Sequence, residues 1–306
     1  MTKLTTQNGK APIGVLLAAT VGFCILLAGK DLLFRVLALG GMSSGQILFM
    51  VGLGCGTTTL LIASLTKTPI NLKNKKLQVL RFFVAGLSGY FIAEAFGILN
   101  ASSVAMVSKI YIPLLLIFSP LIGVSYSKKQ KVLAFASIVG IGVFAIYTRR
   151  PGVPFAGYAY AIIAALLVMV EYITLRRTAL SENSFWTAAT PSVSCLAFGL
   201  LGAGPSHILQ LQTSSTSAIS IAFLAGVILY LIYAVSIHRY RLLPLGISEY
   251  PSLATALILL PVEFAIYGGR PEPSYVICLL STTFLMALTI YFRDHDTVVI
   301  PSRATT

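Results

Sequence analysis

Charged residues are scarce in this chain of 306 residues: they make up 10% of it, against 57% hydrophobic residues. A soluble domain carries about 25% charged residues, so this chain has too little polar side chain to coat a soluble globule. Its apolar runs are continuous and do not alternate with period two, which excludes an outer-membrane barrel. The composition therefore predicts an all-α integral membrane protein, in which helices satisfy the backbone polar groups internally.

Residues typical of catalytic and metal sites are also few. The chain has 3 histidines and 4 cysteines, and no two cysteines have CxxC spacing. The cysteines all fall inside apolar runs, as small buried hydrophobes do. The motifs HExxH, GxSxG and the P-loop are absent, and no His, Cys and Asp cluster has the spacing of a metal site. We therefore predict a protein that is not an enzyme and needs neither cofactor nor metal.

What the chain does have is apolar stretches long enough to cross a bilayer as helices, for which about 20 residues suffice. We predict ten such helices, at residues 12–30, 45–65, 79–98, 102–124, 132–148, 155–175, 186–204, 216–237, 246–267 and 274–292.

Basic residues collect in every second gap between these stretches. Of the 22 Lys and Arg residues, 16 lie in the two tails and the even-numbered gaps, and 3 lie in the odd gaps. This bias follows the positive-inside rule and predicts that both termini are cytoplasmic. The basic side chains that give the net charge of +13 are then expected to contact lipid headgroups and not nucleic acid. Short loops favour a multi-pass protein of a bacterial inner membrane, and the oligomeric state, a homodimer included, stays open.

The fifth gap divides the chain into two halves of five helices. It runs from Thr148 to Pro154 and contains two prolines and a glycine. We expect a tail at 1–11, a first half at 12–148, a second half at 155–292 and a tail at 293–306. Because five is odd, two similar halves must enter the membrane in opposite orientations, which is the inverted-repeat plan of many secondary transporters.

Proline occurs at matching places in the fourth and ninth predicted helices. Pro113 aligns with Pro251, and a second proline follows in each helix, at Pro120 and Pro261. Proline frees the carbonyl four residues back and kinks a helix. Matched kinks in both halves indicate a binding site near the membrane midplane, although membrane helices also tolerate proline without such a role.

Ionisable residues inside a bilayer are costly and need a partner, water or a function. Glu94 and Lys109 lie at similar depth on neighbouring antiparallel helices, so we expect an ion pair. Either these residues face a watery cavity and hold a charged substrate, or they form a structural salt bridge. Glu249, two residues before Pro251, aligns with Tyr111. It can hold a cation, a substrate amine or a proton, or it can pair with a nearby arginine, Arg239 or Arg241.

Tyrosines are plentiful, 14 in all, and their rings suit a planar or cationic substrate. In addition to Tyr111, the candidate substrate-binding tyrosines are Tyr90, Tyr230, Tyr233 and Tyr250. Packing between helices is the alternative role for these rings.

Other intramembrane charges have simpler interpretations. We expect Glu171 to reach toward Arg176 and Arg177 at the membrane surface. Lys30, Asp31 and Arg35 are expected at the outer interface, and Glu263 is a weaker candidate for the site.

Three segments resemble the drug/metabolite transporter superfamily, in its ten-helix EamA-like branch. They are Asn100–Ala105 leading to Pro113, Ser248–Pro251, and Glu272 with Pro273. The chain departs from the family at 126–129, where an acidic residue is expected. The resemblance implies a 5+5 inverted repeat and alternating access to a central cavity. It also implies that helices 1, 3, 4, 6, 8 and 9 line this cavity, and that substrates range from amino acids to nucleotide sugars and S-adenosylmethionine.

The sequence thus predicts a secondary transporter, either an exchanger or an ion-coupled carrier. Its substrate would be a small polar metabolite, such as an amino acid or an S-adenosylmethionine-like zwitterion or cation. The alternative is a membrane scaffold or assembly subunit that transports nothing.

Overall fold

A computed structural model describes residues 13–68, 73–118, 126–148, 154–181, 186–204, 216–242, 248–268 and 271–291. Within these ranges the backbone alone is described at 13–17, 179–181, 187, 241–242, 250 and 289–291.

Every regular element in the described ranges is a helix, which confirms the predicted all-α class. In chain order the elements are α1 (Ile13–Leu39), α2 (Ser44–Leu65), α3 (Lys75–Ile98), α4 (Ala101–Ser108), α5 (Tyr111–Ile117), α6 (Lys128–Tyr147), α7 (Ala156–Ser181), η2 (Trp186–Ala188), α8 (Ala189–Ala203), α10 (Thr216–Leu242), η4 (Tyr250–Leu253), α12 (Ala254–Tyr267) and α13 (Pro273–Tyr291).

Five of these helices, α2, α3, α6, α7 and α10, are long and apolar enough to cross a membrane. Shorter apolar helices occur at Ala101–Ile117, Ala189–Ala203, Pro251–Tyr267 and Pro273–Leu288. α1 is 27 residues long, and charged residues interrupt its apolar sequence.

Polar caps determine where two of the long helices begin. Ser43 and Gln46 form a capping box at the start of α2, and Ser127 and Gln130 form another at the start of α6. In such a box each side chain accepts a hydrogen bond from a backbone N–H group that the helix leaves unpaired.

Two predicted helices differ most from the observed ones. The first, predicted at 12–30, continues to Leu39 because apolar residues resume after Arg35. The fourth, predicted at 102–124, is divided into α4 and α5 by a turn at Lys109 and Ile110. Residues 119–125, which include Pro120, lie outside the described ranges.

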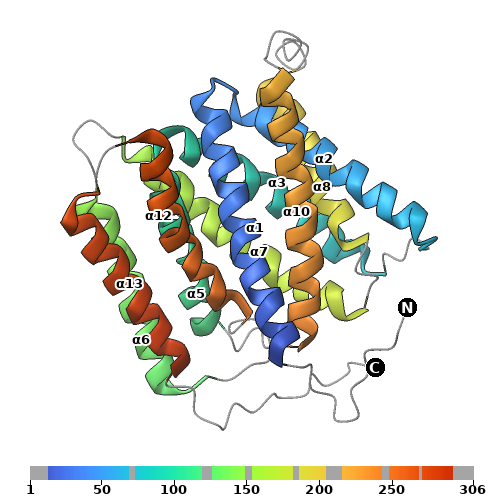
Figure 1. The fold of residues 1–306 in the computed structure, drawn as a ribbon. Helices are drawn as coiled ribbons and strands as arrows, with labels where there is room; N and C mark the ends of the chain where they lie inside the picture. The colour runs from blue at the N-terminus through green and yellow to red at the C-terminus, as the bar shows by residue number, and fades with distance from the viewer. Residues whose placement is uncertain are drawn as a thin grey trace.

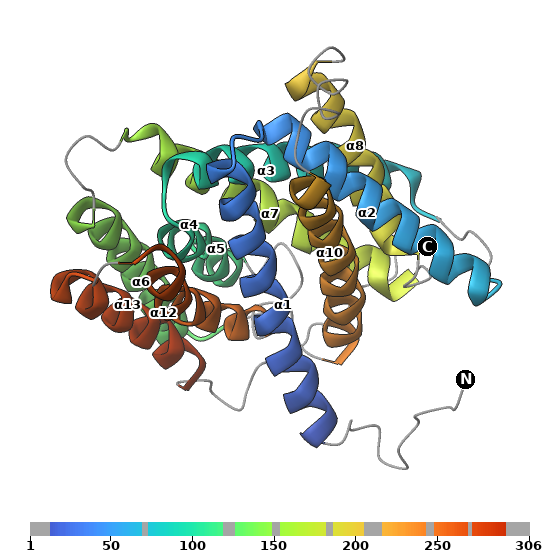
Figure 2. The same ribbon diagram turned by 45° about the horizontal axis from the view of Figure 1, so that its top comes forward.

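The helices form one bundle in which α1 lies between two groups (Figures 1 and 2). At one edge α6 packs against α13, with α12, α4 and α5 beside them. At the other edge α2 packs between α8 and α10. The most extensive contacts, α2 with α8 and α3 with α7, join the first half of the chain to the second, so the halves interleave and do not form separate lobes.

Small residues allow the close approach of α2 to its neighbours. A Cβ atom added to Gly54 would collide with the backbone of Phe223, and one added to Gly226 would collide with Val51. Both contacts lie between α2 and α10. Glycine at such contacts lets helix backbones approach within van der Waals distance.

Candidate functional site

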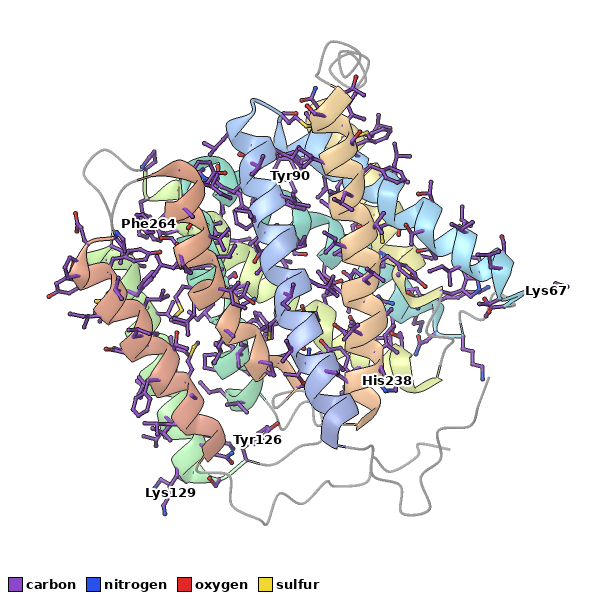
Figure 3. The ribbon with its side chains drawn as sticks, viewed as in Figure 1. Lys67, Tyr90, Tyr126, Lys129, His238 and Phe264 are labelled. Atoms are coloured by element: carbon purple, nitrogen blue, oxygen red, sulfur yellow. The ribbon has the colours of Figure 1, made fainter. Side chains whose placement is uncertain are left out.

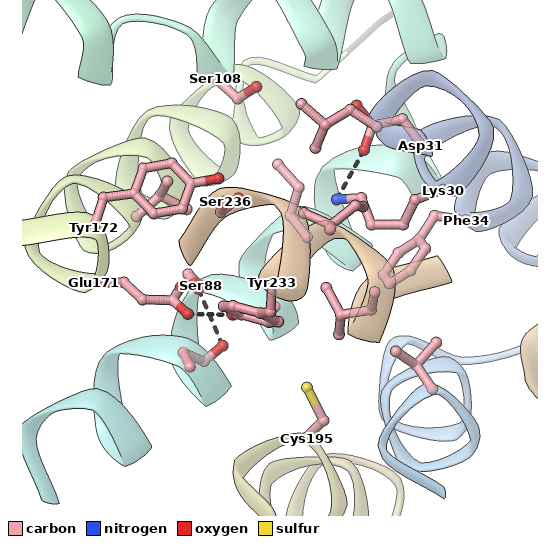
Figure 4. A pocket seen from close by; sticks show the side chains of 18 of the residues that line it. Lys30, Asp31, Phe34, Ser88, Ser108, Glu171, Tyr172, Cys195, Tyr233 and Ser236 are labelled. Carbon is pink, nitrogen blue, oxygen red and sulfur yellow. Dashed lines mark hydrogen bonds and ion pairs between the residues drawn. The ribbon is translucent and has the colours of Figure 1, made fainter. Parts of the chain in front are cut away.

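A cavity of about 110 Å³ lies within the bundle, beside α1 (Figure 4). Its lining comes from α1, α2, α3, α5, α7, α8 and α10 and from the end of α4. A water molecule needs about 10–15 Å³ of such volume, so several waters fit. The charged side chains in the lining are those of Lys30, Asp31, Lys109 and Glu171.

Lys30 and Asp31 form an ion pair on the cavity wall, with 2.9 Å between Lys30 Nζ and Asp31 Oδ1. Asp31 is 5% exposed, and the Lys30 ammonium lies 5.4 Å from the centre of the Phe34 ring. The expected interfacial position of this pair is wrong. Because α1 continues to Leu39, two more helical turns follow the pair and it lies within the bundle.

Lys109 lies at the break between α4 and α5. Pro113 has no N–H group to donate to the Lys109 carbonyl, which accepts instead from the backbone N–H of Ile112 at 2.9 Å. The side chain is 5% exposed, lines the cavity and places its ammonium 5.8 Å from the centre of the Tyr111 ring. The broken helix therefore presents a positive charge to the cavity.

Glu94 does not form the expected pair with Lys109. The one ion pair within 4.0 Å in the described ranges is Lys30–Asp31, and Asp31 and Lys30 are the charges that act most strongly on Lys109. Glu94 is half-buried in α3 and lies against the hydroxyl of Tyr90. Neither Glu94 nor Tyr90 lines the cavity, and the Tyr90 ring lies against Gly202 of α8.

Glu171 points into the cavity, where it accepts a hydrogen bond from the Tyr233 hydroxyl (Figure 4). It is 4% exposed, so the expectation that it reaches toward Arg176 and Arg177 is wrong. Of the predicted tyrosines on α10, Tyr233 lines the cavity and the buried Tyr230 does not.

Glu249 lies next to the cavity, behind Tyr111, and is fully buried. Its two carboxylate oxygens accept hydrogen bonds from the hydroxyls of Tyr111 and Tyr240, each at 2.7 Å. The ring of Tyr172, which lines the cavity, lies 5.3 Å from that of Tyr111 and 6.0 Å from that of Tyr240. Glu249 forms no ion pair with Arg239. The side chains of Tyr250 and Arg241 lie outside the part of the chain whose side chains the structure describes.

Two of the predicted kink prolines differ in effect. Pro251 lies in the 3-10 turn η4, before α12 begins at Ala254. Its carbonyl accepts a hydrogen bond from the Cys24 thiol at 2.9 Å. Pro261 lies inside α12, which continues to Tyr267.

Glu263, near the far end of α12, holds the start of α4. It accepts hydrogen bonds from the backbone N–H of Ala101 and from the N–H and hydroxyl of Ser102, the last two at 2.9 and 2.6 Å. The Ser102 hydroxyl also lies 2.8 Å from that of Tyr275. These are the donors that a helix start leaves unpaired, so the role of Glu263 is to anchor one helix on another.

Sequence reasoning assigned Arg239 to a loop, but it lies in α10, which continues beyond the predicted end at residue 237 to Leu242. It is fully buried, and its guanidinium carbon lies 3.9 Å from the centre of the Phe23 ring. A signal was available: the segment 238–242 contains no Gly or Pro to end the helix. Phe264 follows Glu263 in the sequence, and His238 precedes Arg239. Figure 3 shows Phe264 and His238 toward opposite ends of the bundle.

No protein-family profile matches this sequence, and no curated protein matches it. The chain is similar in fold to a solved structure described only as "Crystal structure of protein", with a TM-score of 0.56 and 17% sequence identity. The match covers 86% of this chain and 96% of the other. The likeness shows that nearly the whole chain adopts a fold known from experiment, and it carries no information on activity.

Proposed function

We propose that this protein is a secondary transporter of the drug/metabolite superfamily type, embedded in a bacterial inner membrane. It moves a small polar organic metabolite by alternating access to the central cavity. The observation that carries the proposal is the cavity itself, because it lies between helices of both halves and presents Lys109 and Glu171 from opposite halves. Intramembrane ionisable groups that face a cavity are typical of substrate and ion pathways.

The pattern of helix contacts supports an inverted repeat. In this proposal α1 to α6 make up the first five spans, with α4 and α5 as one, and α7 to α13 make up the second five. The repeat then pairs α1 with α7, α2 with α8, α3 with α10, and α6 with α13. Under this pairing, the contact of α3 with α7 has its equivalent in the contact of α10 with α1, and the contact of α3 with α8 has its equivalent in that of α10 with α2. The contacts of α2 with α8 and of α6 with α13 join paired helices and are each their own equivalent. A pseudo-twofold relation between the halves predicts these correspondences.

Broken helices at matching positions are a second support. The turn between α4 and α5 comes just before Pro113, and η4 contains Pro251. Discontinuous helices at the interface of two repeats form the substrate sites of many transporters. Here the first break presents Lys109, and the second presents Glu249 behind Tyr111.

The test starts with a ligand screen. The purified chain is heated with amino acids, nucleotides and S-adenosylmethionine, because a true ligand raises the unfolding temperature by mass action. The compound that stabilises is then followed into proteoliposomes. We expect Lys109→Ala to abolish uptake and Lys129→Ala, which changes an exposed lysine, to leave it unchanged. Uptake that survives in the Lys109→Ala variant would refute the site assignment.

A scaffold or assembly subunit that transports nothing is the alternative. It predicts that intramembrane charges are neutralised in pairs around a solid interior, and the cavity beside Lys109 favours transport over this alternative. Cys195, a native cavity residue, provides a discriminator. Its labelling by a water-soluble thiol reagent should depend on the side of addition and on ligand in a transporter, and on neither in a scaffold.

A further inference from the structure

The polar groups around the cavity are not equally satisfied. Asp31 is paired with Lys30, Glu171 accepts from Tyr233, and Glu249 accepts from two tyrosine hydroxyls. Each carboxylate near the cavity therefore already has a donor among the described residues.

The buried positively charged donors near the cavity, in contrast, are not all satisfied. Arg239 is fully buried, and its Nε, Nη1 and Nη2 atoms have no hydrogen-bond acceptor in the described part of the chain. Lys109 likewise has no carboxylate within 4.0 Å there. A buried guanidinium offers five N–H donors, and leaving such a charge unpaired costs several kcal/mol. A ligand that satisfies this site must therefore bring acceptors.

Arg239 is connected to the cavity through its own helix. Ser236 precedes it by three residues, so the two side chains lie on the same face of α10. Ser236 lines the cavity (Figure 4), and its buried hydroxyl also lacks a partner among the described residues. On the neighbouring helix, Leu27 lines the cavity and Phe23, one turn before it, stacks on the guanidinium.

The stacking also determines how a ligand approaches. Phe23 covers one face of the guanidinium, so its free N–H groups point outward in the plane of the group. A carboxylate or phosphate matches this edge with two parallel hydrogen bonds. A cationic ligand would meet a positive group with no acceptor to offer.

We propose that the substrate is an organic anion. It binds first at Lys109 in the cavity and then at a second anion-binding site beyond the cavity, formed by Arg239 and Ser236. This inference rests on the proposed transport function and narrows its substrate class to carboxylates or phosphoryl compounds. In the conformation described here Arg239 is fully buried, and the second site receives the anion when α1 and α10 separate.

The test uses the full chain in nanodiscs, with Cys24, Cys55 and Cys278 replaced by alanine so that Cys195 reports on the cavity. The rate of Cys195 labelling by a small methanethiosulfonate is measured with sodium succinate, sodium phosphate or putrescine dihydrochloride at equal ionic strength. We expect the anions to slow labelling and putrescine not to. Comparing succinate with phosphate separates the two sources of negative charge.

The variant Arg239→Met separates a ligand site from a structural role. We expect it to raise the half-protecting anion concentration at least tenfold and to raise the melting temperature of the ligand-free protein, because it removes an unpaired buried charge. Arg177→Met, at an exposed position of α7, is the matched control and should change neither. Arg239→Lys keeps the charge and should give intermediate protection.

Three outcomes would overturn the inference. They are protection by putrescine alone, no protection by either anion, and a lower melting temperature of Arg239→Met with unchanged anion protection. If the protein takes up a cation and no anion, the transport proposal stands and the anion-binding site is refuted. If anions protect Cys195 but the protein transports no compound, the anion-binding site stands and the transport proposal is refuted.

Discussion

The two ends of the bundle treat buried charge in different ways. At the Glu263 end, Glu263 accepts from the backbone and hydroxyl donors at the start of α4, and Arg35 donates to the carbonyl of Phe96 at 2.5 Å. At the Arg239 end, the carboxylate of Glu249 accepts, among the described residues, from tyrosine hydroxyls alone, and Arg239 donates to no described residue.

This difference separates a structural region from the region that we propose to be functional. Backbone donors are fixed by the helix that carries them, so α4 and α12 cannot separate without leaving the donors at the start of α4 unpaired. Hydroxyl groups rotate, and an unsatisfied guanidinium can accept a new partner without breaking an old bond. We therefore expect the Arg239 end to exchange partners during a conformational change at lower cost than the Glu263 end.

The largest expected effect is at the Glu263 end. Glu263→Ala leaves the donors at the start of α4 unpaired in a buried place, and we expect a loss of about 3 kcal/mol in the free energy of unfolding. Unfolding in mixed micelles of increasing SDS content measures it. Glu94→Ala, at a half-buried position outside this network, is the control and should cost under about 1 kcal/mol. Equal losses in the two variants would remove the structural role of Glu263.

A sharper comparison sets the two arginines against each other. Arg35→Met removes a charged donor from the Phe96 carbonyl and should lower stability by about 1.5 kcal/mol. The same substitution at Arg239 removes a buried charge that has no hydrogen-bond acceptor among the described residues, so its effect should have the opposite sign. Thermal unfolding of both variants in one detergent tests the comparison, and it fails if both are destabilised alike.

The smallest effects are expected at the tyrosines around Glu249. Tyr111→Phe and Tyr240→Phe each remove one of its two hydroxyl donors, and each should cost about 1 kcal/mol because the other donor remains. The double variant should cost more than the sum, since it leaves a buried carboxylate with neither donor. Strict additivity in this double-mutant cycle would show that the two hydroxyls do not act on one group.

The sequence was informative about elements and less so about the site. The helical class and the approximate places of the helices could be predicted, because each apolar run forms its hydrogen bonds within itself. Predictions were poorest where charges interrupt a run. The charged segment of α1 was assigned to an interface, and the end of α10 to a loop, because a charge in a sequence does not reveal whether a neighbouring helix covers it.

Side-chain partners were the least predictable feature. Glu94 and Lys109 were predicted to lie at similar depth but face different neighbours, because depth along a helix leaves its rotation undetermined. Glu171 was matched to the arginines nearest in sequence, whereas its partner Tyr233 is 62 residues away.

The sequence by itself determined that this chain is helical, where most of its apolar helices lie and which two of them carry matched prolines. These properties depend on local composition and backbone hydrogen bonding, which the chain carries at every point. Only the tertiary structure decided which charges meet: that Lys109 and Glu171 share a cavity, that Glu263 caps a distant helix, and that Arg239 stacks on Phe23 without an acceptor. Those outcomes depend on how helices rotate and cross, which packing between distant segments fixes.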